Sequence, residues 1–159
     1  MSPRRSDRLT RSQPIVSHID TAVSSVLTID TSGEGFVDFS EEARQFIAES
    51  GIVSGMLTLF IRHTSASLTI QENADPDVQT DLLRLLHRLA PRDGNWVHDA
   101  EGPDDMPAHI RTMLTATSLQ VPVIDGRLAL GTWQGIYLIE HRQRPHRREI
   151  VMQAMGSRG

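Results

Sequence analysis

The sequence predicts an α+β fold in which antiparallel sheet dominates, and three observations lead to this class. Segments with strand periodicity are interrupted by only about three helical segments. The last third of the chain contains strand patterns alone. Asp125-Gly126, between two apolar runs, is a strong signal for a two-residue hairpin, which joins antiparallel strands. A doubly wound fold would need regular β–α–β alternation, which this order lacks.

Size and composition indicate one globular domain with a restricted chemistry. The 159 residues are 38% hydrophobic and 23% charged, as is usual for such a domain. There is no Cys, which excludes disulfides, thiolate nucleophiles and thiolate metal sites. All 16 basic residues are Arg, so Schiff-base chemistry and a P-loop lysine are excluded. The net charge of −4 gives no sign of nucleic-acid binding, and no apolar run reaches the ~18 residues that cross a membrane. We expect a cytoplasmic protein.

The chain should open with a flexible tail. Residues 1–14 contain four Arg and almost nothing apolar, a composition that does not fold on its own. A solvated tail is more common than a tail that contacts an acidic partner. We therefore expect a flexible basic tail over residues 1–14 and a single domain over residues 15–159.

Periodicity gives the elements of the domain in order. Alternating apolar and β-branched side chains predict strands, and apolar side chains at intervals of three and four predict helices. The expected strands are 15–29, 36–38, 56–62, 68–70, 118–123, 127–130, 136–141 and 149–155. The expected helices are 41–50, 76–89 and 108–117. The remaining segments are turns and loops, among them an exposed basic loop over 142–148.

Residues 57–77 are the segment around which the other elements are arranged. The leucine face of the expected strand continues to an imidazole, and small side chains after it leave space beside the ring. Asp75-Pro76 is typical of the start of a helix. The polar side chains gathered here are His63, Thr64, Ser65, Glu72, Asn73 and Asp75. They predict a site for chemistry or anion binding, although a core histidine and a capping Asp are the simpler interpretation.

Three histidines are candidates for a metal site. His63, His98 and His109 each lie at an element boundary beside small or acidic residues. Three neutral imidazoles with an open position are a known arrangement for zinc, and magnesium or manganese are the alternatives. Nearby acids could orient the rings or complete the ligand shell, namely Glu72, Asp99, Asp104 and Asp105. In the competing interpretation the histidines are hydrogen-bond hubs or acid–base groups.

Four further residues could contact a substrate. Arg62 and Arg111 are candidates for binding an anion, with surface salt bridges as the simpler interpretation. Trp133 and Gln134 lie in a turn between two glycines, where packing is the more common role of Trp.

Three segments resemble the secondary thiamine-phosphate synthase family, also called YjbQ-like. Residues 118–140, SLQVPVIDGRLALGTWQGIYLIE, are similar to the family signature of Ser, alternating aliphatic residues and Gly-Thr-Trp-Gln. Residues 62–77, RHTSASLTIQENADPD, resemble its HTSA and Glu–Asn–Asp segment. Residues 97–110, VHDAEGPDDMPAHI, resemble its paired-histidine segment. The resemblance covers about residues 15–155.

The resemblance implies a fold, an assembly and a set of site residues. The fold would be α+β with a mainly antiparallel β-sandwich core and about three helices, assembled as a homotrimer. The implied catalytic residues are His63, Glu72, Asn73, His98 and His109, with a divalent metal ion at His63, His98 and His109. The substrate-binding candidates are then Arg62, Thr64, Ser65, Asp75, Arg111, Trp133 and Gln134.

The family label implies thiamine-phosphate synthesis, in which a pyrimidine methyl pyrophosphate and a thiazole phosphate are joined and pyrophosphate is released. We therefore expect a metal-assisted enzyme that acts on a small phosphorylated substrate, with Glu72 as the general base. Alternatives are a metal-dependent hydrolase and a non-catalytic trimer that binds a small anion or metabolite. No nucleic-acid or membrane partner is expected.

Overall fold

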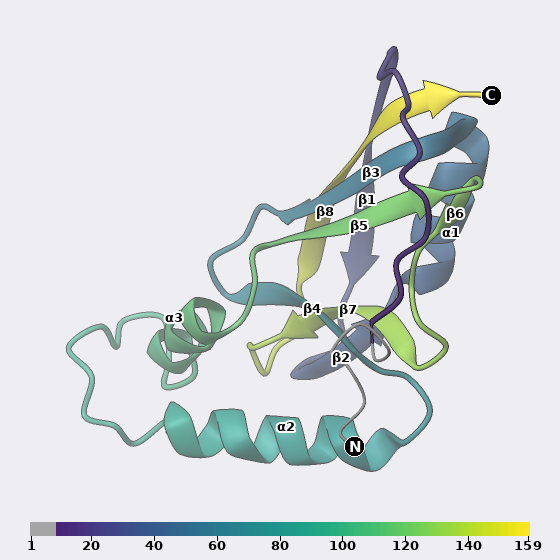
Figure 1. Cartoon of the computed structure of the whole chain (residues 1–159). Coiled ribbons are helices and arrows are strands. Elements are labelled where there is room, and N and C mark those ends of the chain that lie inside the picture. Colours follow the sequence, from purple (N-terminus) through teal and green to yellow (C-terminus); the bar gives the residue numbers. More distant parts are fainter. Residues whose placement is uncertain (1–8) are drawn as a thin grey trace, which may run out of the picture.

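The structure is a computed structural model, and it describes residues 9–159. It confirms the predicted α+β class with antiparallel sheets (Figure 1). The strands are β1 (Thr21–Asp30), β2 (Gly35–Asp38), β3 (Ile52–Ile61), β4 (Ala66–Glu72), β5 (Ser118–Ile124), β6 (Arg127–Leu128), β7 (Gln134–Glu140) and β8 (Arg147–Arg158). The helices of the described residues are α1 (Ser40–Ser50), α2 (Pro76–Leu89) and α3 (Asp105–Leu114). One sheet has the order β1-β8-β3-β5-β6, and a smaller sheet has the order β2-β7-β4.

The core lies between the two sheets and beneath α1. Alternation in β3 shows why: Leu57 and Leu59 are buried, whereas Met56 and Phe60 are exposed on the outer face. Buried residues of β4, β7 and α1 belong to the same cluster, among them Leu68, Ile136 and Phe46. The core therefore holds the ends of β3, β4 and β8 in fixed positions, and the candidate site is built on these ends.

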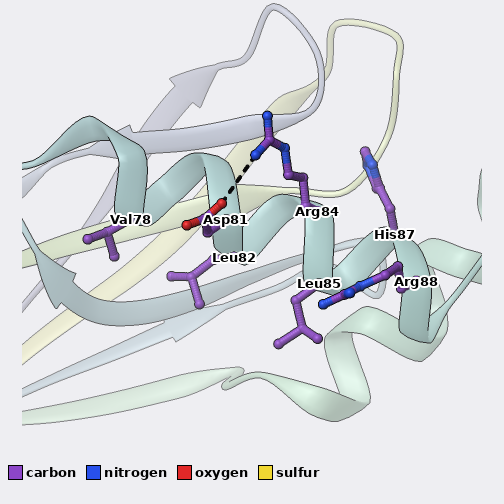
Figure 2. A pocket seen from close by; sticks show the side chains of 7 residues that line it. All are labelled: Val78, Asp81, Leu82, Arg84, Leu85, His87 and Arg88. Carbon is purple, nitrogen blue, oxygen red and sulfur yellow. Dashed lines mark hydrogen bonds and ion pairs between the residues drawn. The ribbon is translucent and has the colours of Figure 1, made fainter.

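Helix α2 begins and ends where the sequence predicted, and it runs beside the small sheet (Figure 1). Asp75 is the N-cap, and its Oδ1 accepts a hydrogen bond of 2.9 Å from the backbone N–H of Asp77. A hollow of about 850 Å³ is lined by α2 alone. Figure 2 shows Leu82 and Leu85 pointing to the same side, with Asp81 and Arg84 ion-paired at 3.3 Å. Because one helix lines it, this hollow is an open helix face rather than an enclosed site.

The predicted boundaries of four elements were wrong by several residues: β3 begins at Ile52 rather than at residue 56 and β8 ends at Arg158 rather than at 155, and β1 and α3 also differ. β1 begins at Thr21 rather than at residue 15, because pairing with β8 starts opposite Gly156, and residues 15–19 are exposed. α3 spans Asp105–Leu114 rather than 108–117. The prediction placed Pro107 before the helix, but Pro107 lies in the first turn, where backbone N–H groups have no intrahelical acceptor and proline is tolerated.

The expected exposed loop over 142–148 is wrong at both of its ends. The side chain of Arg142 is 13% exposed and that of Arg148 only 4%, and β8 begins at Arg147. Each arginine is drawn inward by a buried carboxylate, because an ion pair offsets the cost of removing either charge from water. Residues 143–145 and Arg147 are the exposed part of the segment.

Residues 9–20 form no regular element and are exposed. The predicted flexible tail lies outside the described residues over positions 1–8. Among the described helices, none combines the length and the apolar character that a membrane crossing requires.

Candidate functional site

Two of the predicted metal ligands, His98 and His109, meet at the start of α3. The Nε2 atoms of His98 and His109 lie 2.8 and 3.2 Å from the same oxygen, Oδ2 of Asp105. The two ring centroids are 5.5 Å apart. One ligand atom from each of the three residues lies within 4.8 Å of the others. Asp105 is buried, whereas both rings keep an accessible edge. The group therefore offers two nitrogens and one oxygen to a single cation.

The backbone fixes which nitrogen of His109 is free. Its Nδ1 donates to the carbonyl oxygen of Thr64 at 3.0 Å, since a carbonyl can only accept. In a neutral ring, Nε2 then carries a lone pair that faces the Asp105 carboxylate. The Nε2 lone pair and the carboxylate oxygen lie 3.2 Å apart, so a cation placed between them would interact favourably with both. Ligating histidines usually donate their other N–H to a carbonyl in this way.

Asp105 is held by an arginine that the sequence did not single out. Arg142 Nη1 contacts Asp105 Oδ1, Nε donates to Asp104 Oδ2 at 3.1 Å, and Nη2 donates to the carbonyl of Glu101 at 2.9 Å. Oδ2 of Asp105 is thereby left to the two histidines. Although burial acts to raise it, the His98 hydrogen bond and the Arg142 charge hold the pKa of Asp105 below its ordinary value. The carboxylate is therefore ionised and oriented.

His63, the third predicted ligand, is not part of this group. Its Nε2 accepts a hydrogen bond of 2.8 Å from the backbone N–H of Glu149. Burial and the neighbouring charge of Arg148 lower the pKa of His63, so the ring is neutral near pH 7 and its proton resides on Nδ1. Neither nitrogen then has a lone pair to offer a metal. Asp105, rather than His63, is the third member of the group that could hold a metal ion.

A cavity adjoins the histidine group on the side of the Thr64 turn. It has a volume of about 490 Å³, and its wall includes Arg62, His63, Thr64, Ser65 and Arg148. The carbonyl of Thr64 is the link, because it accepts a hydrogen bond from His109 Nδ1. Three of the predicted substrate contacts, Arg62, Thr64 and Ser65, therefore do share one cavity with His63.

The other half of the predicted site lies at the far end of β4. The strand runs from Ala66, beside the Thr64 turn, to Glu72, and seven extended residues span about 20 Å. The residues at the Glu72 end are joined by the pairing of Glu72 with Gln134 and by hydrogen bonds from Asn73 to the backbone of residues 132–133. The group consists of Glu72, Asn73, Asp75, Trp133 and Gln134. Within one chain the two groups do not form one site.

The residues at this far end have local partners. Glu72 accepts hydrogen bonds from the backbone N–H groups of Ala74 and Asp75, at 3.1 and 2.8 Å. The amide of Asn73 donates to the carbonyl of Thr132 at 3.3 Å, and Gln134 accepts from the N–H of Gly131. Trp133 is 64% exposed and is not a core residue. The turn before α2 is thus held by the side chains that were predicted as catalytic.

The two candidate anion-binding arginines are both engaged. Arg62 forms an ion pair with Glu149 at the rim of the cavity, and about half of its side chain is exposed. Arg111 is 2% exposed, contacts Glu34, and donates to the carbonyl of Ala90 at 3.0 Å. A substrate at the histidine group cannot reach this buried guanidinium, so Arg111 is part of the interior.

Three polar residues near the site, two of them buried and one largely covered, were missed. Arg142 orients Asp105, Arg148 lines the cavity, and His141 lies in the interior with its Nε2 2.8 Å from Ser67 Oγ. A signal for Arg148 was present, because residues 148, 150, 152 and 154 are all buried at period two along β8. Extending the predicted strand by two residues would have pointed Arg148 inward.

Comparisons with known proteins agree with this fold. Residues 25–157 match the family described as "UPF0047 protein YjbQ-like". UPF0047 protein sll1880 of Synechocystis is 52% identical over 82% of this chain and 90% of its own length, and UPF0047 protein YjbQ of Escherichia coli O157:H7 is 44% identical over 82% and 95%. The crystal structure of a YjbQ/UPF0047 family protein from Clostridium acetobutylicum, 39% identical, covers 80% of this chain and 97% of that one with a TM-score of 0.75. The chain therefore belongs to the UPF0047, or YjbQ-like, family.

Proposed function

We propose that the protein is a metal-assisted enzyme that acts on a small phosphorylated substrate at His98, Asp105 and His109. The observation that carries this proposal is the His109 ring, which donates from Nδ1 and turns Nε2 towards a buried carboxylate oxygen 3.2 Å away. That arrangement presents a lone pair and a negative charge to the same point in space.

The donor set indicates which cation the group suits. Metal–nitrogen and metal–oxygen bonds of about 2 Å place neighbouring ligand atoms roughly 3 Å apart, close to the distances found here. Two imidazoles and one carboxylate fit zinc, and also manganese or iron(II). Magnesium prefers oxygen ligands and is the weaker candidate. A bound divalent ion would supply positive charge beside phosphoryl oxygens and activate water.

The residues of the chain have separate tasks in this proposal. His98, His109 and Asp105 would hold the ion, while Arg142 fixes the carboxylate. The cavity beside the Thr64 turn would hold the substrate, and its volume of about 490 Å³ suits a small molecule. Glu72 lies about 20 Å away along β4, so it could act as general base only from a neighbouring copy.

The finer label, thiamine-phosphate synthase, rests on the family resemblance. A metal beside an anion cavity suits the departure of pyrophosphate in that reaction, and it suits hydrolysis of a phosphate ester equally well. The alternative from another class is a trimer that binds a small anion or metabolite without turnover. The local hydrogen bonds that occupy Glu72, the predicted general base, favour this alternative over the other rivals.

We also propose that the chain assembles as a homotrimer through the outer face of the large sheet. Three neighbouring cross-strand rows carry no charge: Ala22–Met155–Met56–Pro122, Ser24–Gln153–Thr58–Gln120 and Val26–Val151–Phe60–Ser118. Val26, Met56, Phe60 and Met155 are 38–49% exposed on this face. An uncharged face with exposed apolar side chains is typical of an interface. Phe60→Asp should convert a trimer to monomers in native mass spectrometry, and a wild-type monomer would contradict the assembly.

The experiment that tests the function is metal analysis combined with a substrate screen. Purified wild-type protein should contain close to one zinc or other divalent ion per chain, and His98→Ala should contain almost none. Wild type should convert a phosphate ester or the thiamine precursors, and chelation or His98→Ala should abolish turnover. Metal-loaded protein that binds but never converts these compounds would favour the binding-protein alternative. Turnover retained in His98→Ala would overturn the proposal.

A further inference from the structure

We propose that His63 and Arg148 form an oxyanion subsite in the cavity beside the histidine group, and that it receives the phosphate of the substrate. The cavity of about 490 Å³ lies between the end of β3, the Thr64 turn and the start of β8. This inference rests on the proposed function. It places the phosphate of the substrate next to the metal ion rather than in direct contact with it.

Arg148 is the first element of this subsite. Its side chain is only 4% exposed, yet it lines the cavity. Nε donates to Glu140 Oε2 at 2.7 Å, and Nη2 donates to Glu140 Oε1 at 2.6 Å and to Ser65 Oγ at 2.9 Å. Among the described residues, Nη1 has no hydrogen-bond acceptor. A guanidinium carries five N–H donors, so a buried arginine here keeps donors in reserve beside a cavity.

Glu140 explains why the arginine stays in place. Its carboxylate is fully buried and accepts two hydrogen bonds from Arg148, one from Thr31 Oγ1 at 2.8 Å and one from the backbone N–H of Arg142 at 2.9 Å. Although burial acts to raise it, the Arg148 hydrogen bond holds the pKa of Glu140 below its ordinary value. Glu140 is therefore a saturated carboxylate that fixes the guanidinium before any ligand arrives, which is the preorganisation that oxyanion sites use.

His63 supplies the second donor. The backbone N–H of Glu149 occupies Nε2, and the neutral ring therefore carries its proton on Nδ1. No described residue accepts a hydrogen bond from this Nδ1. A neutral N–H donor and an arginine whose charge is offset by Glu140 bind an oxyanion by direction more than by net charge. The cation at the histidine group would supply the remaining charge.

The rival anion-binding residue is Arg62, at the rim of the same cavity. It forms an ion pair with Glu149, and about half of its side chain is in water, where such a pair is weak and mobile. A phosphate bound by Arg62 would stay solvated. Arg148, which is buried, and His63, which is partly buried and held by the Glu149 N–H, offer fixed donors instead, so the subsite is assigned to this wall of the cavity.

The test is a titration of metal-stripped protein with inorganic phosphate, followed by the side-chain nitrogen resonances of His63. Phosphate should shift the His63 Nδ1 resonance. Arg148→Gln alone would leave Glu140 buried without its partner and would destabilise the chain, so the informative variant is the neutral pair Glu140→Gln/Arg148→Gln. It should weaken phosphate binding at least tenfold, as should His63→Ala. Arg144→Gln removes an arginine from the exposed part of the same segment and should change the affinity less than twofold.

The outcomes separate this inference from the proposed function. Equal phosphate affinity in wild type and in the Glu140→Gln/Arg148→Gln variant would overturn the subsite. So would the absence of any His63 shift in both metal-stripped and zinc-loaded wild type. His109→Ala should lose zinc and keep metal-free phosphate binding. If wild type binds phosphate at His63 but never binds a divalent metal, the subsite stands and the metal-assisted function falls.

Discussion

His63 and His109 differ in one backbone partner, and this difference gives them opposite chemistry. A carbonyl, that of Thr64, accepts from Nδ1 of His109 and leaves its Nε2 lone pair free. A backbone N–H, that of Glu149, donates to Nε2 of His63 and leaves a proton on Nδ1. The first ring is suited to hold a cation and the second to donate to an anion. Residue type alone therefore does not define a metal ligand. The backbone group that is hydrogen-bonded to one ring nitrogen decides whether the other nitrogen offers a lone pair or a proton.

The largest expected effect tests directly whether His109 and His63 differ in metal binding. His109→Ala should weaken zinc binding at least about 100-fold, because it removes one of three ligands. His63→Ala should change zinc affinity less than about threefold, since His63 has no lone pair to give. Competition with a fluorescent zinc chelator measures both. Equal loss of zinc in the two variants would restore His63 as a ligand and refute the assignment of its tautomer.

The next effect concerns the residue behind Asp105. Arg142→Gln should weaken zinc binding by about 10- to 100-fold, because the carboxylate loses the contact that orients it. Thermal unfolding measured alongside shows whether the chain is still folded. Arg144→Gln is the matched control, since it removes the same charge from an exposed position two residues away. The positioning role is wrong if the two variants bind zinc alike.

A third histidine sharpens the comparison, because His141 faces neither a metal nor a cavity. Burial first, and then the charge of Arg111, lower the pKa of His141 to about 3. Below pH 6.5 the unfolded chain binds a proton at this position that the folded chain does not, so stability falls as the pH falls from about 6.5 towards 3. Each pH unit in this window costs about 1.4 kcal/mol from His141.

Urea unfolding between pH 7 and 5 measures this loss of stability. His141→Gln should flatten the pH dependence, because it removes the group that titrates. His146→Gln alters a histidine of the neighbouring loop that is partly exposed, and the slope should persist in it. A slope that is unchanged in His141→Gln would show that the buried ring is not its cause.

Elements whose signals are local were predictable from the sequence. Helix α2 was bounded correctly because Asp75-Pro76 begins it and a leucine stripe follows. The Asp125-Gly126 turn is present, with φ of 51° and 71° at the two residues. Asp105 and His109 lie four residues apart on one face of α3, so the correct start of that helix would have paired them.

The partners of the site residues were not predictable, because they come from distant parts of the chain. Arg142 is 37 positions from Asp105, and the Glu149 N–H that fixes His63 is 86 positions away. A short pattern such as His-Thr-Ser-Ala does not predict which backbone group will form a hydrogen bond with its imidazole. The sequence therefore indicated which side chains belong to the candidate site. The register of β8 determines the hydrogen-bond partners of His63 and Arg148, and thereby their roles.

The smallest expected effect tests whether the two ends of β4 are independent. Asp75→Ala removes the N-cap of α2, including the 2.9 Å hydrogen bond to the N–H of Asp77, and should cost about 1 kcal/mol of unfolding free energy. Zinc affinity should not change, because the capped turn lies about 20 Å from His109 along the strand. Chemical denaturation and zinc competition on the same sample measure both quantities. A loss of zinc binding in trimeric Asp75→Ala would mean that the turn of one copy reaches the histidine group of another, which would bring Glu72 back as a general base.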